Sequence, residues 1–138
     1  MRKFLLDIVD GIILVEPKLI VKNRKPVKIA MALDTGANRM TIPIEIALLL
    51  GFNINQPIAR AEMITVSGIE YAPILSIPRV RIFGFEIKDV DAVCHDLPPR
   101  SKVSGLLGLN ILSHFNVHLN FLDNSLEIFE GRGEDNNA

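Results

Sequence analysis

The amino-acid sequence is divided into short apolar segments, rich in Ile, Val and Leu, that Gly, Pro or Asn residues interrupt. The interruptions recur at about the 8 to 12 residue spacing that is typical of an all-β barrel or sandwich. No uninterrupted apolar run approaches the roughly 18 residues that a membrane-spanning helix requires. This pattern predicts one compact all-β domain over residues 1–130. Residues 131–138 are polar and lack apolar anchors, so we expect a frayed tail there.

Individual strands and two short helices can be predicted from the same pattern. Paired strands are expected at residues 4–9 with 11–15, 19–22 with 27–33, 62–66 with 69–75, 80–82 with 85–94, and 116–122 with 126–129. A short buried helix is expected over residues 43–51, because Pro43 suits a first turn and Gly51 suits the position after the last turn. Residues 108–114 form a weaker helix candidate.

The charge balance argues against a nucleic-acid-binding protein. Lys and Arg number 15 against 16 Asp and Glu, and the chain has one Tyr and no Trp, so it lacks both a basic field and a stacking platform. A local basic cluster, which we interpret as the solvated face of a hairpin, consists of Lys18, Lys22, Arg24, Lys25 and Lys28. Asp7 and Asp10 interrupt the apolar residues near the N-terminus, so this segment is interpreted as structure rather than as a signal peptide. We expect a soluble, cytoplasmic protein with no nucleic-acid or membrane partner.

Two motifs are candidates for chemistry. Asp34-Thr35-Gly36-Ala37 directly follows an apolar strand, so its carboxylate is held where the backbone turns beside the core, although a strand-ending turn uses the same residue types. About seventy residues later, Leu106-Leu107-Gly108 precedes the second predicted helix, and Gly108 lets another backbone approach because it has no Cβ. This second motif lacks the Lys-Ser/Thr pair of a P-loop and the third glycine of a dinucleotide-binding turn, so it does not predict a phosphate site.

Together, in this order and in a β-rich chain, the two motifs resemble those of the retropepsin-like aspartic proteases, which carry an apolar-Asp-Thr/Ser-Gly-Ala/Ser loop and a later apolar-apolar-Gly motif. The resemblance extends from about Lys18 to Phe129. It implies a closed retropepsin-like barrel with one or two short helices, assembled as a C2 homodimer. It also implies an aspartic endopeptidase for peptide or protein substrates, in which Asp34 of each subunit activates a water, with no covalent intermediate, no cofactor and no metal.

The chemistry explains why a dimer is needed. Hydrolysis of a peptide bond by carboxylates requires two of them, one ionised to take a proton from water and one protonated to assist the scissile carbonyl. The chain has one Asp-Thr/Ser-Gly sequence, and the other acids, including Asp89, Asp91, Asp96 and Asp123, are interpreted as solvated or capping groups. A C2 homodimer supplies the second Asp34, because an isologous contact brings identical loops together. The two carboxyl groups would then share one proton and titrate as a unit.

The resemblance also implies roles for residues around Asp34. The hydroxyl of Thr35 would bond across the dimer axis, and Gly36 would let the substrate main chain approach the carboxylates. A flap hairpin over residues 62–71, with its tip at Ser67-Gly68, would close over the substrate. The residues expected to contact substrate are Ala37, Asn38, Val66, Ser67, Gly68 and Ile69. The residues expected to support the dimer and the active site are Leu106, Leu107, Gly108 and Asn110.

Three features depart from the retroviral relatives. The expected flap contains a single glycine, Gly68. Asn38 and Leu109 occupy the positions where retroviral relatives have an acid and an arginine, so both ends of that ion pair are absent, which a packed site tolerates better than the loss of one end. Ala37 cannot donate the hydrogen bond that a serine would donate near the carboxylate, so we expect an activity optimum less acidic than in relatives with serine.

Two other functions stay open at this point. A peptide-binding or dimerisation module could keep the fold without turnover, and a monomeric small-ligand barrel would be a single chain in solution. No metal site is predicted, because His118 is expected on a strand rather than on one helical face with His114, and no third ligand has suitable spacing. Cys94, the single cysteine, is interpreted as a small core residue, because on a strand it and His95 point to opposite faces.

Overall fold

The computed structural model describes residues 1–130, and the tail predicted for residues 131–138 lies outside the described residues. The strands are β1 (Arg2–Leu5), β2 (Ile8–Val9), β3 (Ile12–Val15), β4 (Lys18–Ile20), β5 (Val27–Lys28), β6 (Met31–Leu33), β7 (Met40–Ile42), β8 (Ala59–Thr65), β9 (Gly68–Ile82), β10 (Phe85–Cys94), β11 (Gly105–Leu107), β12 (Phe115–Asn120) and β13 (Ser125–Glu130). The helices are α1 (Ile44–Leu49) and α2 (Leu109–Leu112). This element content confirms the prediction of an all-β fold with short helices.

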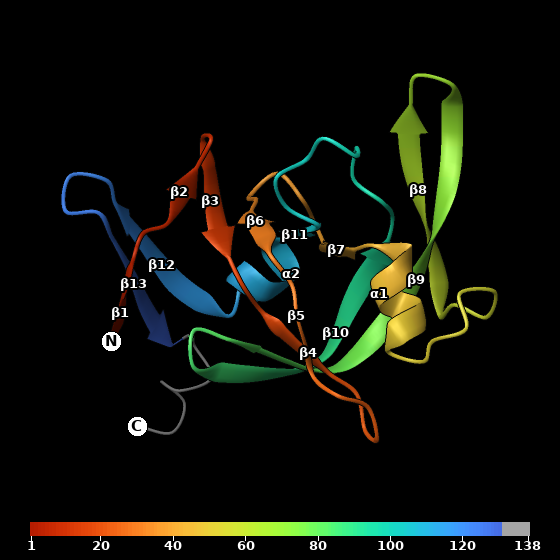
Figure 1. Ribbon diagram of the computed structural model, residues 1–138, viewed down its shortest axis with the longest axis horizontal. Coiled ribbons are helices and arrows are strands. Elements are labelled where there is room, and N and C mark those ends of the chain that lie inside the picture. Colours follow the sequence, from red (N-terminus) through yellow and green to blue (C-terminus); the bar gives the residue numbers. More distant parts are fainter. Residues whose placement is uncertain (131–138) are drawn as a thin grey trace.

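The strands form one large curled sheet and one small sheet (Figure 1). The large sheet has the order β2-β3-β6-β11-β7-β10-β9-β4-β5, and β8 pairs with β9 as a projecting hairpin. The end strands β2 and β5 do not pair with each other in the described part of the chain, so the sheet is curled rather than closed into a ring of paired strands. The small sheet has the order β1-β13-β12.

The strand β11 brings the two sequence motifs together. It pairs in parallel with β6, where Leu107 is opposite Leu33, and antiparallel with β7, where Leu106 is opposite Thr41. A parallel pair requires a long crossover, so strands far apart in the sequence become neighbours. The residue after β6, Asp34, therefore lies beside the residue after β11, Gly108.

The core lies within the curl of the large sheet and holds these strands in position. Side chains with no exposed surface come from separate strands and include Leu19, Met31, Met40, Ile77 and Leu107. Burying an aliphatic side chain of this size contributes about 1.5–3 kcal/mol relative to leaving it exposed. The strands that border the Asp34 motif are thus anchored by apolar packing on the side away from solvent.

Two strands expected from the sequence are each divided in the structure. Residues 4–9 are divided between β1 and β2. Leu6 between them is buried in the core, and its N–H makes the last bond in register with the β1–β13 ladder, to Asn124 O (3.0 Å). As a result β1 pairs with β13, whereas β2 pairs with β3. Residues 27–33 form β5 and β6. The Ile29 N–H between them donates to Pro17 O (3.1 Å), in register with the β4–β5 pairing, and the ladder ends there because Pro17 has no N–H to return a bond.

In residues 69–82 the expected strands are joined rather than divided. The strands expected at 69–75 and 80–82 are one continuous strand, β9. Pro78 has no N–H and faces Asp89, whose φ of 53° removes that residue from the ladder as well. Pairing resumes on both sides, with Ile77 opposite Val90 and Arg79 opposite Lys88, so the proline does not end the strand.

Both helices lie within their predicted ranges. The N–H of Ile44 in the first turn of α1 donates to Asp96 Oδ1 (2.9 Å), so a side chain from a distant loop caps the helix. Gly51 follows with φ +87°, a left-handed conformation that glycine adopts without a Cβ penalty. Neither helix of the described chain has the length and apolar character required to cross a membrane.

Candidate active site

Asp34 begins a tight loop between β6 and β7, which we call the Asp34 loop (residues 34–39). Its backbone N–H donates to Leu107 O (3.0 Å), so the loop starts against the second motif. Asp34 is half-buried, and its Oδ1 accepts a hydrogen bond from the Gly36 N–H (2.8 Å). Thr35 and Gly36 are exposed. This hydrogen bond holds one carboxylate oxygen against the backbone of the loop.

The second motif supports the Asp34 loop from below. The N–H of Leu109 donates to Ala37 O (2.8 Å), and the N–H of Asn110 donates to Asn38 O (3.2 Å). Gly108 is the residue that allows this approach, because a Cβ there would lie 2.6 Å from Arg39 O and 2.7 Å from Ala37 O. Both distances are shorter than real Cβ contacts. The Asp34 loop could therefore not keep this position if any residue other than glycine stood at position 108.

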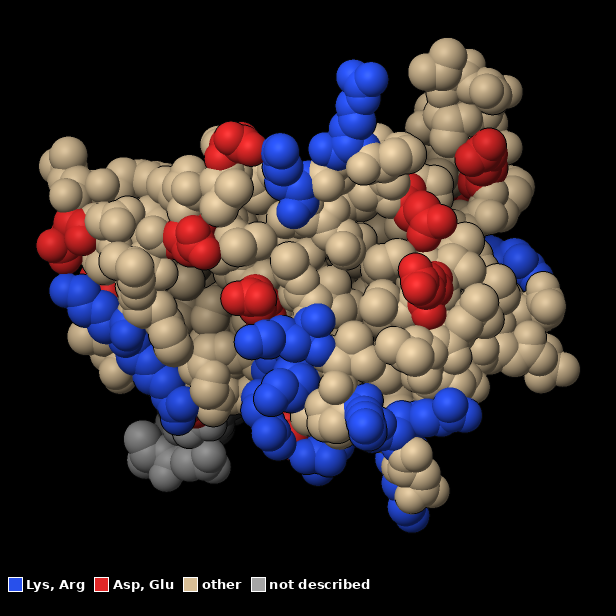
Figure 2. Space-filling view, viewed as in Figure 1, with Lys and Arg blue, Asp and Glu red and all other residues tan. Residues whose placement is uncertain are grey.

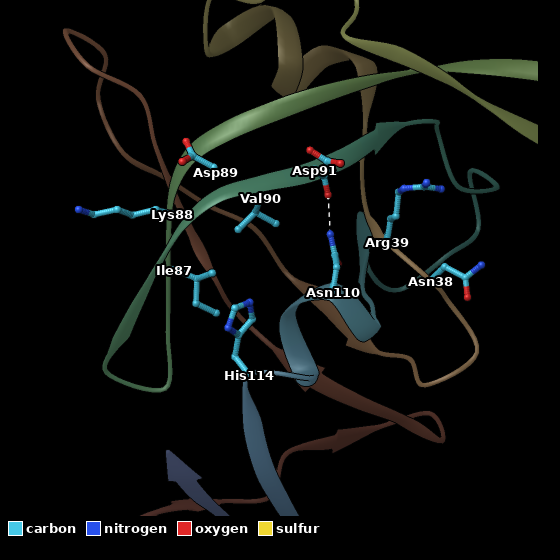
Figure 3. Close-up of a pocket in the computed structure, with 9 residues that line it drawn as sticks. All are labelled: Asn38, Arg39, Ile87, Lys88, Asp89, Val90, Asp91, Asn110 and His114. Carbon is cyan, nitrogen blue, oxygen red and sulfur yellow. Dashed lines mark hydrogen bonds between the residues drawn. The ribbon is translucent and has the colours of Figure 1, made fainter. Parts of the chain in front are cut away.

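Asn110 joins three segments with its side chain. Its Oδ1 accepts from the Met40 N–H (2.9 Å), at the end of the Asp34 loop, and its Nδ2 donates to Asp91 O (2.8 Å) on β10. Figure 3 shows this side chain reaching from α2 to the backbone of β10. Because it uses both its donor and its acceptor, the amide ties the loop, the helix and β10 to one another.

A polar pocket of about 370 Å³ lies beside this connection (Figure 3). It is lined by Asn38, Arg39, Ile87, Lys88, Asp89, Val90, Asp91, Asn110 and His114. Sequence reasoning assigned functional roles only to Asn38 and Asn110 in this set. Arg39, Asp91 and His114 each lie on a different segment, and only the topology brings them together.

An apolar hollow of about 230 Å³ lies on another side of the Asp34 loop. It is lined by Leu33, Thr35, Leu109, Leu112, Ser113, Phe115, Val117 and Leu119. Leu33 and Thr35 are the two neighbours of Asp34, and the apolar residues of β12 line the hollow opposite them. Among the strands of residues 1–130, β12 is also an edge of the small sheet, because it pairs with β13 alone. The alternation of apolar Phe115, Val117 and Leu119 with polar residues is the sequence signal that could have indicated this surface.

The β8–β9 hairpin projects from the large sheet on the same upper side of Figure 1 as the loop between β6 and β7. The predicted tip is one residue wrong, because Thr65 pairs with Gly68 and the turn is Val66-Ser67. The Thr65 hydroxyl donates to Gly68 O (2.9 Å) and closes this turn. The tip exposes apolar side chains, with Val66 fully exposed and Ile69 58% exposed. The structure shows no contact between these tip residues and Asp34.

The remaining candidates lie outside this site. His118 lies on β12 as expected, with its ring 5.0 Å from that of Phe129. Cys94 is buried at the end of β10, and burial, followed by the negative charge of Asp96, raises the pKa of its thiol to about 11. Among residues 1–130, no three His, Cys, Asp or Glu side chains converge as a metal site would require.

Comparisons with known proteins agree with this geometry. A family model described as "gag-polyprotein putative aspartyl protease" matches residues 21–114, which include both motifs and most of the large sheet. The fold is similar to the crystal structure of a retropepsin-like aspartic protease from Rickettsia conorii, with a TM-score of 0.70 and 23% sequence identity over 91% of this chain and 89% of the other. A search of curated protein sequences finds no match.

Proposed function

Since the chain belongs to the gag-polyprotein aspartyl protease family, we propose that it is an aspartic endopeptidase and that Asp34 is its catalytic carboxylate. The observation that carries the proposal is the position of Asp34, half-buried at the end of β6 with Oδ1 held by the Gly36 N–H. Retropepsin-like enzymes hydrolyse peptide bonds with this type of carboxylate, and no other acid of the described chain lies in a comparable glycine loop.

The proposed reaction needs a second carboxylate, and we propose that a second copy of the chain supplies it. One Asp34 would be ionised and would take a proton from water, and the other would be protonated and would polarise the scissile carbonyl. Water then adds to the carbonyl directly, so no covalent enzyme intermediate forms. Two carboxyl groups that lie so close cannot both ionise at low cost, so the pair would share one proton.

The apolar hollow beside Thr35 supports a homodimer. Its lining comes from both neighbours of Asp34 and from the edge strand β12, so a second copy seated there would bring its own Asp34 loop close. Leu109, which is 42% exposed, borders the same hollow and takes the position of the arginine of retroviral relatives. An isologous contact would bury this apolar surface twice, once on each subunit.

We further propose that the β8–β9 hairpin is a flap and that its tip contacts substrate. Val66 and Ile69 are exposed apolar residues at this tip, and exposed apolar side chains on a projecting hairpin are consistent with a surface that is covered when substrate binds. Ser67 and Gly68 complete the tip and would offer backbone groups to an extended peptide. Closure of the hairpin would exclude bulk water from the carboxyl pair.

Substitution of the carboxylate tests the whole proposal. Asp34→Asn should abolish cleavage of a diverse peptide library, because an amide cannot accept the proton of water, while analytical ultracentrifugation should still detect a dimer. Asp10→Asn is a matched control, since Asp10 is exposed in a turn where asparagine also tolerates the positive φ of 50°. Cleavage that persists in Asp34→Asn at the wild-type rate would reject the proposed chemistry.

A second candidate is a peptide-binding module that keeps the fold without turnover. The single glycine at the hairpin tip and the absence of the retroviral ion pair at Asn38 and Leu109 favour this alternative. It predicts that the wild-type chain binds a peptide mimic with a hydroxyl in place of the scissile carbonyl, yet cleaves no library peptide at any pH from 3 to 8. The endopeptidase predicts both binding and cleavage.

A further inference from the structure

One face of the large sheet carries a cluster of cations that the proposed reaction does not use. We call this surface the basic face, and it consists of Lys18, Lys28, Arg79, Arg81 and Lys88, all of them exposed. Lys18 lies opposite both Lys28 and Arg81, and Arg79 lies opposite Lys88. Their neighbours Leu19, Val80 and Ile87 are buried, so the cations point outward from one side of β5, β4, β9 and β10.

Only part of this surface is evident from the sequence, namely the cations of the β4–β5 hairpin. The topology adds two arginines of β9 and one lysine of β10. Residues 18–28 and 79–88 contain eight Lys and Arg residues and one acid, Glu86. Figure 2 shows these charges gathered along the lower part of the molecule, where Figure 1 places β4, β5, β9 and β10.

This arrangement is unfavourable for the isolated sheet. Like charges directly opposite one another on neighbouring strands destabilise the pair. Lysine and proline commonly protect a free sheet edge from pairing, and this explains Pro26 and Lys28 next to and on the edge strand β5. It does not explain Arg79 and Arg81, because at these residues β9 pairs with β4 on one side and with β10 on the other. The retained repulsion points to a partner that carries negative charge.

The face already holds one carboxylate. Glu86 Oε1 accepts hydrogen bonds from Arg79 (2.8 Å) and Arg81 (3.2 Å), and the bond from Arg79 contributes most to lowering the pKa of Glu86. The two arginines keep further N–H donors, because a guanidinium has five. Arg79 and Arg81 therefore already bind the acidic side chain of a polypeptide in this structure.

The surroundings disfavour other anionic partners. The large apolar side chains that are exposed in the described chain all lie outside residues 18–28 and 79–88, so the basic face offers a membrane no group to insert. It also offers no exposed aromatic ring on which a nucleic-acid base could stack. Along β9, the Cα atoms of Arg79 and Arg81 are about 6.8 Å apart, as expected for alternate residues of a strand. Alternate side chains of an extended peptide have the same spacing.

We infer that the basic face docks an extended acidic segment of a polypeptide, in which alternate Asp or Glu side chains meet the cations of β4, β5, β9 and β10. The β8–β9 hairpin and the loop between β6 and β7 lie on the opposite side of the molecule in Figure 1. Docking on this side therefore leaves the Asp34 loop free and does not depend on Asp34, and Lys88 is the residue that the basic face shares with the polar pocket. A protein held at this face would be presented at a raised effective concentration to the same molecule.

The test is a fluorescence-anisotropy titration of the full chain with a labelled twelve-residue peptide of alternating Glu and Ser, and with the same peptide carrying Gln for Glu. The wild-type chain should bind the Glu peptide, should bind it more weakly as salt increases, and should not bind the Gln peptide. The double variant Lys18→Gln, Lys28→Gln should lose roughly threefold to tenfold in affinity. The control double variant Lys3→Gln, Lys102→Gln removes equal charge from exposed side chains elsewhere and should bind as the wild type does.

Several outcomes would overturn the inference. Equal affinity of the wild-type chain for the Glu and Gln peptides would overturn it. Equal losses of affinity in the two double variants would overturn it as well. Tighter binding of a twelve-nucleotide polyuridine or of phosphatidylserine vesicles would reassign the face to another class of partner. Asp34→Asn should bind the Glu peptide like the wild type, so failure of the proposed catalysis would not be mistaken for failure of docking. Mass spectrometry of the recovered peptide would establish that it stays intact.

Discussion

Replacement of Gly108 by alanine would perturb the contact between the two motifs with one methyl group. Gly108 has an ordinary φ of −97°, so alanine is not strained by its own backbone conformation there. The obstacle is space, because the new Cβ would lie 2.6 Å from Arg39 O, whereas ordinary Cβ contacts begin at 3.4 Å. The Asp34 loop or the start of α2 must therefore move by about 0.8 Å.

The expected loss can be estimated from this displacement. Overpacking a site of this kind costs typically 1–3 kcal/mol. The shift also lengthens the hydrogen bond from the Leu109 N–H to Ala37 O, now 2.8 Å, and a bond of this type contributes about 1 kcal/mol. Gly108→Ala should thus lower the free energy of unfolding by about 2–4 kcal/mol. A displacement near 1 Å at a reacting group costs on the order of a hundredfold in rate, so cleavage should fall as well.

The assay is urea unfolding at fixed protein concentration, together with kcat/KM for a peptide that the wild type cleaves. Gly11→Ala is the control, because a Cβ at Gly11 meets nothing within 4 Å while its φ of +77° still disfavours alanine. The control should lose about 1 kcal/mol of stability through backbone strain alone and keep the wild-type kcat/KM. If Gly108→Ala unfolds within 0.5 kcal/mol of the wild type and cleaves equally well, the close approach of the two motifs does not determine the geometry of the site.

Three further predictions concern single side chains. Asn110→Ala should cost about 2–3 kcal/mol in urea unfolding, because it leaves the Met40 N–H and the Asp91 carbonyl without partners. Asn110→Asp should cost at least as much, because it keeps the first bond but sets a carboxylate oxygen against the Asp91 carbonyl oxygen. Ala37→Ser should move the optimum of kcat to lower pH, because a serine hydroxyl would favour an ionised carboxylate; a pH profile that coincides with that of the wild type would contradict this. The pKa of the Cys94 thiol is raised from 9.0 to about 11 by burial first and by Asp96 second, so its contribution to stability is fully present below pH 9 and is lost as the pH rises toward 11. Urea unfolding at pH 8 and pH 11 should therefore show a smaller decrease for Cys94→Ala than for the wild type, and equal decreases would contradict the assigned pKa.

The parts of the site that could be predicted are those with a local signature. A carboxylate, a hydroxyl and a glycine after an apolar strand mark the Asp34 loop, and Gly108 after two leucines marks the segment that supports it. The helix α1 could be predicted as well, because Pro43 and Gly51 influence only their own neighbourhood. In each of these cases the physical cause lies within a few residues of the effect.

The parts that could not be predicted depend on pairing over long distances. Leu6 divides the first strand because it fits the core beside β13, more than a hundred residues away, and no local pattern encodes that contact. Pro78 indicates the end of a strand, because proline has no N–H to donate to the ladder. The facing residue Asp89, with its positive φ, is also outside the ladder, so no partner requires that N–H. The polar pocket is a similar case, because Arg39 and Asp91 become neighbours only through the parallel pairing of β7 with β10.

The unbroken course of β9 has a consequence for how the chain can vary in length. This strand runs for 15 residues from the hairpin tip at Gly68 to Ile82, and it carries Arg79 and Arg81 near its far end. Successive side chains of a strand point to opposite sides, so the loss or gain of one residue reverses every side chain beyond it. A deletion between Tyr71 and Val80 would bury the two arginines or turn the hairpin over, since no loop exists there to absorb it. Natural variants should therefore change length in the loops at residues 51–58 and 95–104, and keep this segment constant.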